Sequence, residues 1–290
     1  MSVGDGKLAV IGWPVSHSRS PLIHNHWLAA HGAPALYEAY PIDPKDDFRA
    51  ALEAMAAAGY LGANVTVPHK HAAFAAMDEL STTAQRLGAV NTISFKNGKL
   101  RGDNTDGDGF IASLDAAARS INGKGSQNWR DHPALVLGAG GAARAIIAAL
   151  GRTGMADIRL VNRSRDKAEA VKGLAANLHI DDWPVRAAMA AGCGLLVNTT
   201  SLGMVGQPPL GVPEAALHAL RPNALVCDIV YAPLETPLLH AAKAAGHIAV
   251  DGLGMLMHQA ALSFEIWHGT RPAIEATLRD RLIADLAREA

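Results

Sequence analysis

Residues 134–143 have the sequence Ala-Leu-Val-Leu-Gly-Ala-Gly-Gly-Ala-Ala. The first four residues are apolar and predict a buried strand, and the alanine-rich residues 142–152 predict the helix that follows. In such a unit Gly138 permits the tight turn, Gly140 lets the backbone approach a pyrophosphate, and Ala143 permits close helix–strand packing. The amino end of the helix adds unpaired N–H groups and a positive dipole. The stretch predicts a dinucleotide site formed by Gly138, Ala139, Gly140, Gly141 and Ala142, and a tight turn that binds nothing is the weaker alternative.

The second strand of this unit, residues 158–161, indicates which dinucleotide is bound. It ends at Asn162, where an NAD site usually carries an acidic residue that holds the ribose diol and repels a 2′-phosphate. A neutral Asn162 beside Arg163 favours the phosphate instead, because a guanidinium pairs well with it. Lys167 adds positive charge. We therefore expect NADP rather than NAD, and an ordinary basic helix start is disfavoured because cations are unfavourable at that end of a helix.

A second polar stretch is Gly-Ala-Asn-Val-Thr-Val-Pro-His-Lys, at residues 62–70. We predict a strand over residues 63–67, ended by the proline because proline cannot continue the sheet ladder. Asn64 and Thr66 lie two apart and share a face of that strand, and Lys70 follows near its end, where open α/β sheets collect ligand groups. An amide, a hydroxyl and an ammonium aimed at one place suit a small polyhydroxylated ligand. A solvated loop lysine is the alternative.

The composition argues against several other classes of protein. The chain has 290 residues, 49% of them hydrophobic, and a net charge of -1, which argues against nucleic acid or an anionic membrane as the main partner. Cys193 and Cys227 show no CxxC or Cys/His spacing, so we expect no disulfide framework and no metal site. Residues 8–15 do not read as a signal peptide and no apolar stretch is long enough to span a bilayer, so we expect a cytoplasmic protein.

Apolar strands and amphipathic helices alternate along the chain, which predicts an α/β fold with parallel sheets and crossover helices. A hairpin around Asn97-Gly98 joins residues 89–95 to residues 99–103. Residues 119–133 are polar and predict an exposed loop. The other expected strands are residues 7–11, 37–42, 195–198 and 225–229. The expected helices are residues 46–58, 71–87, 164–177, 255–267 and 272–289, and one that begins at Ser20-Pro21 with Ser20 as its N-cap.

Polar motifs follow one another along almost the whole chain. They are Gly12-Trp-Pro-Val-Ser-His-Ser18-Arg-Ser20-Pro21, Asn64-Val-Thr66-Val-Pro68-His-Lys70, Ala89-Val-Asn91-Thr92, Gly102-Asp-Asn104-Thr105-Asp106-Gly107, Asn162-Arg163-Ser164 and Asp251-Gly252-Leu-Gly254-Met255 with Gln259. In this order they resemble the motifs of the shikimate dehydrogenase family, which reduces 3-dehydroshikimate to shikimate with NADPH. Two residues depart from that family pattern. His71 stands where an acidic residue is common, and Ser164 replaces the more usual Thr.

The resemblance implies a role for each matched residue. Lys70 and Asp106 match the catalytic pair of the family. The residues that would hold the substrate carboxylate are Ser18, Ser20, Thr66 and Tyr231, and those that would bond the ring hydroxyls are Asn64, Asn91 and Gln259. Further residues of the cofactor site would be Ser164, Thr200 and Gly252.

The expected chemistry fits the catalytic pair. Hydride transfer to a carbonyl carbon leaves an oxygen that must gain a proton, and a Lys70 ammonium close by can stabilise the developing alkoxide and pass the proton. Asp106 would position that ammonium through a charge-assisted hydrogen bond. Proton donation by Lys70 and polarisation of the substrate by Lys70 both fit the sequence.

The resemblance also implies two α/β domains with the active site in the cleft between them. Residues 1–106 and 252–290 would form a substrate-binding domain with a parallel-type sheet, and residues 107–251 would form a Rossmann-like NADP-binding domain. The partners would be a small-molecule substrate and NADP, with no nucleic acid and no membrane. The family includes monomers and homodimers, and no surface stripe in the sequence decides between them.

Three other readings compete with this one. A quinate or dual quinate/shikimate dehydrogenase would share the fold, but such relatives often carry an acidic residue at position 162 and Thr in place of Ser20. A methylenetetrahydrofolate dehydrogenase would not explain the serine motif or Asn104-Thr105-Asp106. A non-catalytic NADP/shikimate-binding sensor is disfavoured because Lys70 and Asp106 are both present and no DNA-binding segment is appended.

Overall fold

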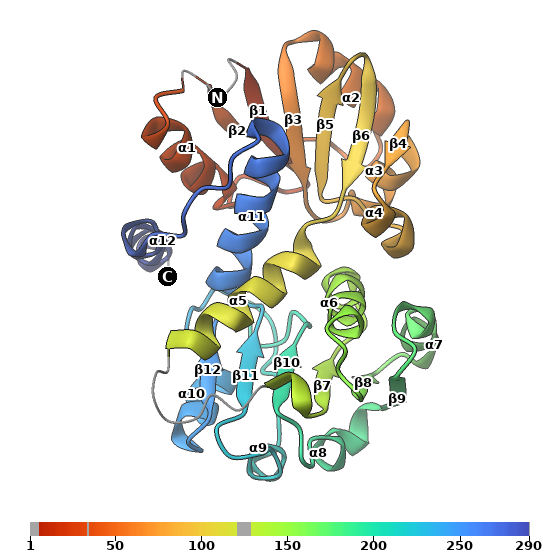
Figure 1. The fold of residues 1–290 in the computed structure, drawn as a ribbon, viewed down its shortest axis with the longest axis vertical. Coiled ribbons are helices and arrows are strands. Elements are labelled where there is room, and N and C mark those ends of the chain that lie inside the picture. Colours follow the sequence, from red (N-terminus) through yellow and green to blue (C-terminus); the bar gives the residue numbers. More distant parts are fainter. Residues whose placement is uncertain (1–5, 34, 121–128, 290) are drawn as a thin grey trace. The chain divides into compact units, whose positions relative to one another are not determined.

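The computed structural model describes residues 6–33, 35–120 and 129–289. The chain divides into two compact units. Unit 1 comprises Met1–Thr105 and Gln259–Ala284, and unit 2 comprises Asp106–His258 and Asp285–Ala290. Each unit is built around one six-stranded sheet flanked by helices, as Figure 1 shows. In the described part of the chain, every helix is too short or too polar to cross a lipid bilayer.

The sheet of unit 1 is mixed, with the strand order β2-β1-β3-β5-β6-β4. Strands β1, β2 and β3 run parallel, as the alternation of strands and helices predicts, whereas β5 and β6 form an antiparallel hairpin. The predicted hairpin turn is confirmed, since Asn97 and Gly98 have positive φ angles of 54° and 72°. The strands are β1 Lys7–Gly12, β2 Tyr37–Pro41, β3 Tyr60–Val65, β4 Glu79–Leu80, β5 Thr92–Lys96 and β6 Lys99–Asp103.

Helices cover both faces of this sheet. Ala63 and Val65 of β3 pack into a core with α2 (Phe48–Ala57), α3 (Lys70–Ala76) and α4 (Thr82–Leu87). Because strand side chains alternate, Asn64 faces the opposite side. On that side lie α1 (Ser20–Ala30) and the unit 1 part of α11 (Gly252–His268), which contact the sheet through their aromatic and polar side chains. The last helix is α12 (Ala276–Glu289).

Gly62 allows α11 to approach β3 closely. A Cβ atom at this position would lie 2.2 Å from the carbonyl oxygen of Ile93 and 2.4 Å from Nε1 of Trp267. Those two atoms are joined by a hydrogen bond of 2.9 Å, in which Trp267 Nε1 donates. A larger residue at position 62 would disrupt that hydrogen bond. Glycine therefore allows α11 to lie close enough for its side chains to contact Asn64.

The sheet of unit 2 is entirely parallel, with the strand order β12-β11-β10-β7-β8-β9. Counted within the unit, this is the order 3-2-1-4-5-6 of doubly wound dinucleotide-binding sheets, in which ligands bind where the order reverses, between β7 and β10. The strands are β7 Ala134–Leu137, β8 Ile158–Asn162, β9 Leu178–Asp182, β10 Leu195–Asn198, β11 Leu225–Asp228 and β12 Ile248–Val250.

The helices of unit 2 lie on both sides of its sheet. α8, α9 and α10 pack on one side with Leu135, Val161 and Val226, and α6 packs against α5 on the other. The helices are α5 Asp106–Ser120, α6 Gly141–Arg152, α7 Arg165–Glu169, α8 Arg186–Met189, α9 Glu214–His218 and α10 Pro237–Ala244, and short 3₁₀ segments span Trp129–Asp131, Lys172–Leu174 and Trp183–Val185. Of the predicted loop 119–133, residues 121–128 lie outside the described residues.

Two predicted helices are wrong in extent. Residues 71–87 form α3 and α4 with β4 between them, because β4 pairs with β6 and Asp78 accepts a hydrogen bond of 2.8 Å from the Leu100 amide. Residues 164–177 contain only α7 and a 3₁₀ turn. Strands β9 and β12 were not expected from the sequence, and both pair only at sheet edges.

Smaller corrections concern element ends. Ser20 is the first residue of α1, and Arg19 occupies the N-cap position without a side-chain cap, so the predicted Ser20 cap is wrong. Strand β3 ends at Val65 rather than residue 67, although the Thr66 amide still donates to the Ile11 carbonyl at 2.8 Å. Because Ser20 is not the N-cap of α1, its hydroxyl is not used for capping.

Candidate functional site

A buried polar network lies in unit 1 on the face of the sheet that carries Asn64. Asn64, Asn91 and Thr105 are 5%, 2% and 5% exposed, and Ser263 of α11 is fully buried. Gln259, one turn before Ser263 on α11, is half-buried. All three residues predicted to bind the ring hydroxyls therefore belong to one unit and one network: Asn64, Asn91 and Gln259.

The hydrogen bonds determine which way the Asn64 carboxamide points. Its Nδ2 lies 3.2 Å from the Asn91 carbonyl oxygen, which can only accept, and it also donates to Ser263 Oγ at 2.9 Å. Its Oδ1 accepts from the Tyr37 hydroxyl at 2.8 Å. Since the N–H groups point into the protein, Asn64 can offer a ligand only an acceptor.

Asn91 has the opposite polarity. Its Oδ1 accepts from the Thr105 amide at 2.8 Å and from Thr92 Oγ1 at 2.9 Å. Its Nδ2 donates to Thr105 Oγ1 at 3.0 Å and to Gln259 Oε1 at 3.4 Å. A ligand hydroxyl that accepts from Asn91 Nδ2 would compete with Gln259 Oε1 for this N–H group. Together Asn64 and Asn91 present an acceptor and a donor, which suits a hydroxyl group.

The predicted carboxylate residues lie at the start of α1 and beyond β3. The Ser20 amide donates to Ser18 Oγ at 3.3 Å. Ser20 is buried, whereas Ser18 and Thr66 are half-buried. The fourth residue, Tyr231, lies in unit 2 after β11 and is half-buried.

Lys70 is the first residue of α3 and is half-buried. Its neighbours are held by backbone contacts: His69 Nε2 lies 2.7 Å from the Ile42 carbonyl, and His71 Nδ1 lies 2.9 Å from the Gly88 carbonyl. Asp106 opens α5, is 5% exposed and belongs to unit 2. The pairing of Lys70 with Asp106 therefore stays a prediction from the sequence.

The glycine-rich turn of unit 2 has the geometry that a phosphate cradle needs. Gly138 has a φ of 100°, and a Cβ there would lie 2.6 Å from Cγ2 of Thr200. A Cβ at Gly140 or Gly141 would meet no atom within 4 Å, so the backbone is open to an approaching group. Helix α6 begins at Gly141 without a side-chain cap, and Ala139 and Ala142 are half-buried beside the glycines. These residues fit a pyrophosphate against the amino end of α6.

Asn162 connects this turn to the following loop. Its Oδ1 accepts from the Ala139 amide at 3.2 Å, and its Nδ2 donates to the Ser164 carbonyl at 2.7 Å. A carboxylate at this position could not make the second bond, because it has no N–H group. Asn162 therefore links the glycine-rich turn to the loop after β8, and it adds no negative charge there.

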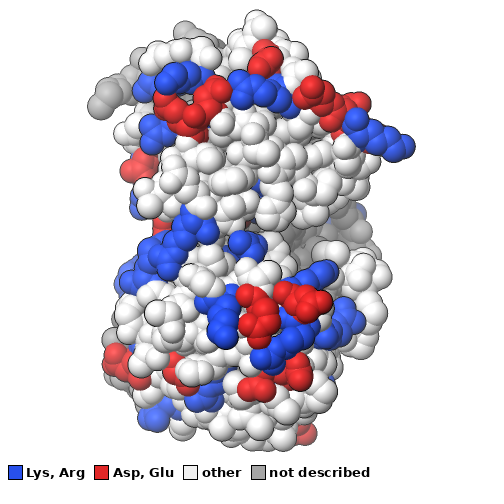
Figure 2. All heavy atoms as spheres, turned by 90° about the vertical axis from the view of Figure 1, so that its right-hand side faces the viewer, with Lys and Arg blue, Asp and Glu red and all other residues white. Residues whose placement is uncertain are grey.

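The basic residues after Asn162 differ in their surroundings. Arg165 bonds Glu169, and Lys172 lies 3.8 Å from the same glutamate. Figure 2 shows basic and acidic groups side by side on this side of the molecule. Arg163 and Lys167 are exposed, and neither forms an ion pair with any residue that the structure describes. Arg163 is thus available to pair with a phosphate.

The ends of β10 and β11 carry a network that the sequence did not indicate. Thr200 Oγ1 donates to Asn198 Oδ1 at 2.7 Å, and Asn198 Nδ2 donates to Asp228 Oδ1 at 2.9 Å. Burial raises the pKa of the Asp228 carboxyl, which also accepts from Thr236 Oγ1 at 2.7 Å. Gly252 lies close to β11, since its Cβ would be 2.3 Å from the Ile229 carbonyl oxygen. These bonds hold the predicted residue Thr200 in place.

Sequence reasoning also missed Tyr37, Thr92 and Ser263 as parts of the unit 1 network. Ser263 follows Gln259 by four residues, so helical spacing places the two on one face of α11. That spacing was a usable signal. Tyr37 carries no comparable signal, because an aromatic residue opening a strand is an ordinary core residue.

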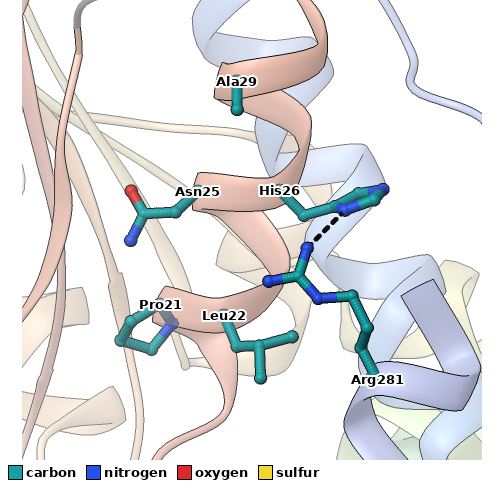
Figure 3. A pocket seen from close by; sticks show the side chains of 6 residues that line it. All are labelled: Pro21, Leu22, Asn25, His26, Ala29 and Arg281. Atoms are coloured by element: carbon teal, nitrogen blue, oxygen red, sulfur yellow. Dashed lines mark hydrogen bonds between the residues drawn. The ribbon is translucent and has the colours of Figure 1, made fainter. Parts of the chain in front are cut away.

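A separate hollow of about 290 Å³ lies in unit 1 between α1 and α12 (Figure 3). It is lined by Pro21, Leu22, Asn25, His26, Ala29 and Arg281. Arg281 Nη1 lies 3.0 Å from His26 Nδ1, and the Asn25 amide is occupied by the backbone of Tyr37. None of the residues predicted for the site lines this hollow.

Two segments of the chain match known family descriptions. Residues 10–93 match "Shikimate dehydrogenase substrate binding domain", and residues 252–279 match "Shikimate 5'-dehydrogenase C-terminal domain". The chain is 50% identical to Shikimate dehydrogenase (NADP(+)) of Methylobacterium radiotolerans, over 99% of this chain and 100% of that protein.

Solved structures show the same architecture. Shikimate 5-dehydrogenase from Thermus thermophilus, in complex with NADP(H) and shikimate, has a TM-score of 0.81 at 34% identity, covering 97% of this chain and 99% of that one. Quinate dehydrogenase from Corynebacterium glutamicum, in complex with NAD, has a TM-score of 0.85 at 28% identity over 97% and 99%. The fold defines a two-unit α/β protein with a Rossmann-type sheet in unit 2. The chain belongs to the shikimate dehydrogenase family.

His24 is buried and stacks on Tyr37 in unit 1. Its burial leads us to expect that the stability of the protein depends on pH. Burial lowers the pKa of His24 from 6.5 to about 3, with His268 as a second cause. The folded protein therefore binds fewer protons than the unfolded chain below pH 6.5, and stability is lost as the pH falls. Protonation of His24 in the unfolded chain should lower the free energy of unfolding by about 1.4 kcal/mol between about pH 7.5 and about pH 5.5.

Urea unfolding of the wild type and of His24→Phe at both pH values tests this expectation. The variant keeps an aromatic ring against Tyr37 but has no group to protonate, so its loss of stability should be smaller by that amount. His179→Phe serves as control, because His179 is 69% exposed. Equal losses in the wild type and His24→Phe would contradict the prediction.

Proposed function

We propose that this chain catalyses the reversible NADPH-dependent reduction of 3-dehydroshikimate to shikimate in chorismate and aromatic amino acid biosynthesis. The observation that carries the proposal is the buried acceptor–donor pair Asn64 and Asn91 in the same unit as Lys70. The proposal is supported by 50% identity to a relative named Shikimate dehydrogenase (NADP(+)) over nearly the full length of both chains. NADPH, when bound, supplies a hydride to the ring carbonyl carbon, and the carbonyl oxygen gains a proton.

In this proposal the chain divides its roles between domains. Residues 1–106 and 252–290 bind the substrate, and residues 107–251 bind NADP. The Ser18 and Ser20 hydroxyls hold the carboxylate with help from Thr66 and Tyr231. Asn64 accepts from one ring hydroxyl, and Asn91 with Gln259 binds another.

Lys70 and Asp106 form the proposed catalytic pair. The Lys70 ammonium would stabilise the negative charge that develops on the substrate oxygen and could also donate the proton to it. The Asp106 carboxylate accepts a hydrogen bond from the ammonium and keeps it oriented. In the reverse direction the same lysine would receive the hydroxyl proton.

The cofactor site favours NADP over NAD in this proposal. Gly138 to Ala142 hold the pyrophosphate, and Arg163 pairs with the 2′-phosphate, with Ser164 and Lys167 beside it. The open space over Gly140 and Gly141 and the absence of an ion-pair partner for Arg163 among the described residues support this assignment. Thr200 and Gly252 complete the site.

We further propose that the protein acts in the cytoplasm as a monomer or homodimer. Quinate or dual quinate/shikimate activity is the second candidate function. Similarity to a quinate dehydrogenase solved with NAD favours it, whereas Ser20 and the neutral Asn162 favour shikimate and NADP.

Initial rates with purified protein test the proposal. Absorbance of the reduced nicotinamide is followed with shikimate or quinate and with NADP or NAD. We expect fast turnover with shikimate and NADP alone. Comparable turnover of quinate, or a preference for NAD, would support the second candidate, and no turnover by protein that binds NADP would overturn both.

Lys70→Ala should lower kcat by at least about 100-fold, because a positioned acid–base group contributes that much or more. The KM for shikimate should change only severalfold, since the carboxylate and hydroxyl contacts remain. Steady-state kinetics measure both constants, with exposed Lys96→Ala as the control. A Lys70→Ala protein that kept most of its turnover would show that Lys70 is not catalytic.

Arg163→Ala should raise the KM for NADP by roughly tenfold or more and leave the KM for NAD almost unchanged, because a charge-assisted bond to the 2′-phosphate is lost. The control is Arg165→Ala, since Arg165 is already paired with Glu169. Steady-state kinetics with both cofactors at saturating shikimate give the ratio. An unchanged NADP/NAD preference in Arg163→Ala would remove the argument for this residue.

A further inference from the structure

Tyr37 is a buried residue without a role in the function proposed above. It opens β2, its side chain is 1% exposed, and its hydroxyl donates to Asn64 Oδ1 at 2.8 Å. The partner Asn64 is a proposed substrate-binding residue. Tyr37 is therefore one hydrogen bond away from the site.

The direction of this bond follows from the surroundings of Asn64. The Asn91 carbonyl oxygen faces Asn64 Nδ2, so the atom facing Tyr37 is Oδ1 and the phenol must be the donor. Burial raises the pKa of the Tyr37 phenol well above its usual value, so the phenol keeps its proton. Because its one proton goes to Asn64, the phenol oxygen can act toward any other group only as an acceptor.

Both the ring and the backbone of Tyr37 are held in place by neighbouring residues. It stacks on His24 with centroids 4.2 Å apart and an interplanar angle of 4°. Its backbone is bound twice by Asn25, whose Nδ2 donates to the Tyr37 carbonyl at 2.8 Å and whose Oδ1 accepts from the Tyr37 amide at 2.9 Å. These contacts fix the position of the hydroxyl that donates to Asn64.

We propose that Tyr37 is a positioning residue whose hydroxyl holds the Asn64 carboxamide so that its oxygen accepts from a substrate ring hydroxyl. Tyr37 and Ser263 bind opposite ends of this carboxamide, at 2.8 Å and 2.9 Å, which opposes its rotation. The inference rests on the proposed function, because it assigns Tyr37 a part in shikimate binding.

Tyr37→Phe removes only the hydroxyl and keeps the ring against His24. We expect the KM for shikimate to rise about three- to tenfold, as for the loss of one hydrogen bond, with kcat changed less than about twofold. The KM for NADP should stay constant. Tyr60→Phe is the matched control, since Tyr60 is 8% exposed in the same sheet and its hydroxyl bonds Glu38, outside the network.

Double-mutant cycles separate positioning from a general packing effect. In an Asn64→Ala background, Tyr37→Phe should change kcat/KM for shikimate by less than about twofold, because no carboxamide is left to position. In a Ser20→Ala background it should keep its full effect. Thermal unfolding midpoints of every variant show that each is folded.

Two results would overturn the inference. An equal effect of Tyr37→Phe in the wild-type and Asn64→Ala backgrounds would mean that Tyr37 does not act through Asn64, and an effect lost only with Ser20→Ala would assign it to Ser20. Kinetic constants of Tyr37→Phe equal to those of the wild type would also reject the inference. Failure of the proposed function is distinct, since the wild type and Tyr60→Phe would then both lack turnover of shikimate.

Discussion

One buried carboxamide organises unit 1. Asn64 is 5% exposed, and its amide groups are satisfied by the Tyr37 hydroxyl, the Asn91 carbonyl and the Ser263 hydroxyl. Leaving such a group without partners would cost about 1–3 kcal/mol. The sheet and α11 must therefore meet around Asn64, and Gly62 makes that approach possible. The proposed substrate site follows from this requirement, because the network sets an acceptor at Asn64 and a donor at Asn91.

The same physical requirement shapes the turn of unit 2. Asn162 satisfies the Ala139 amide, and Thr199 Oγ1 donates to the carbonyls of Leu137 and Gly138 at 2.8 Å and 3.1 Å. Side chains thereby hold the turn from within the protein. The space over Gly140 is left open, so the backbone at the start of α6 is what an anion would meet.

Local sequence signals predicted local structure well. The Asn97-Gly98 turn, strands β7 and β10 and helix α6 depend on neighbouring residues, and the structure confirms them. Predictions failed where distant pairing decides. Residues 71–87 are interrupted because β4 pairs with β6, and the Ser81 hydroxyl starts a second helix by accepting from the Ala84 amide at 3.1 Å. Ser20 was expected to cap α1, but the helix begins one residue earlier than that reading requires.

The sequence by itself determined the kind of protein: the glycine turn, the neutral Asn162 beside Arg163, and the ordered motifs that carry Asn64 and Lys70. These are signals of residue type and spacing. Only the tertiary structure decided the polarity of the network, because the partners of Asn64 come from Tyr37 and Ser263, 27 and 199 residues away. A carboxamide has a donor end and an acceptor end of similar shape, so its orientation depends on which groups surround it in the folded chain.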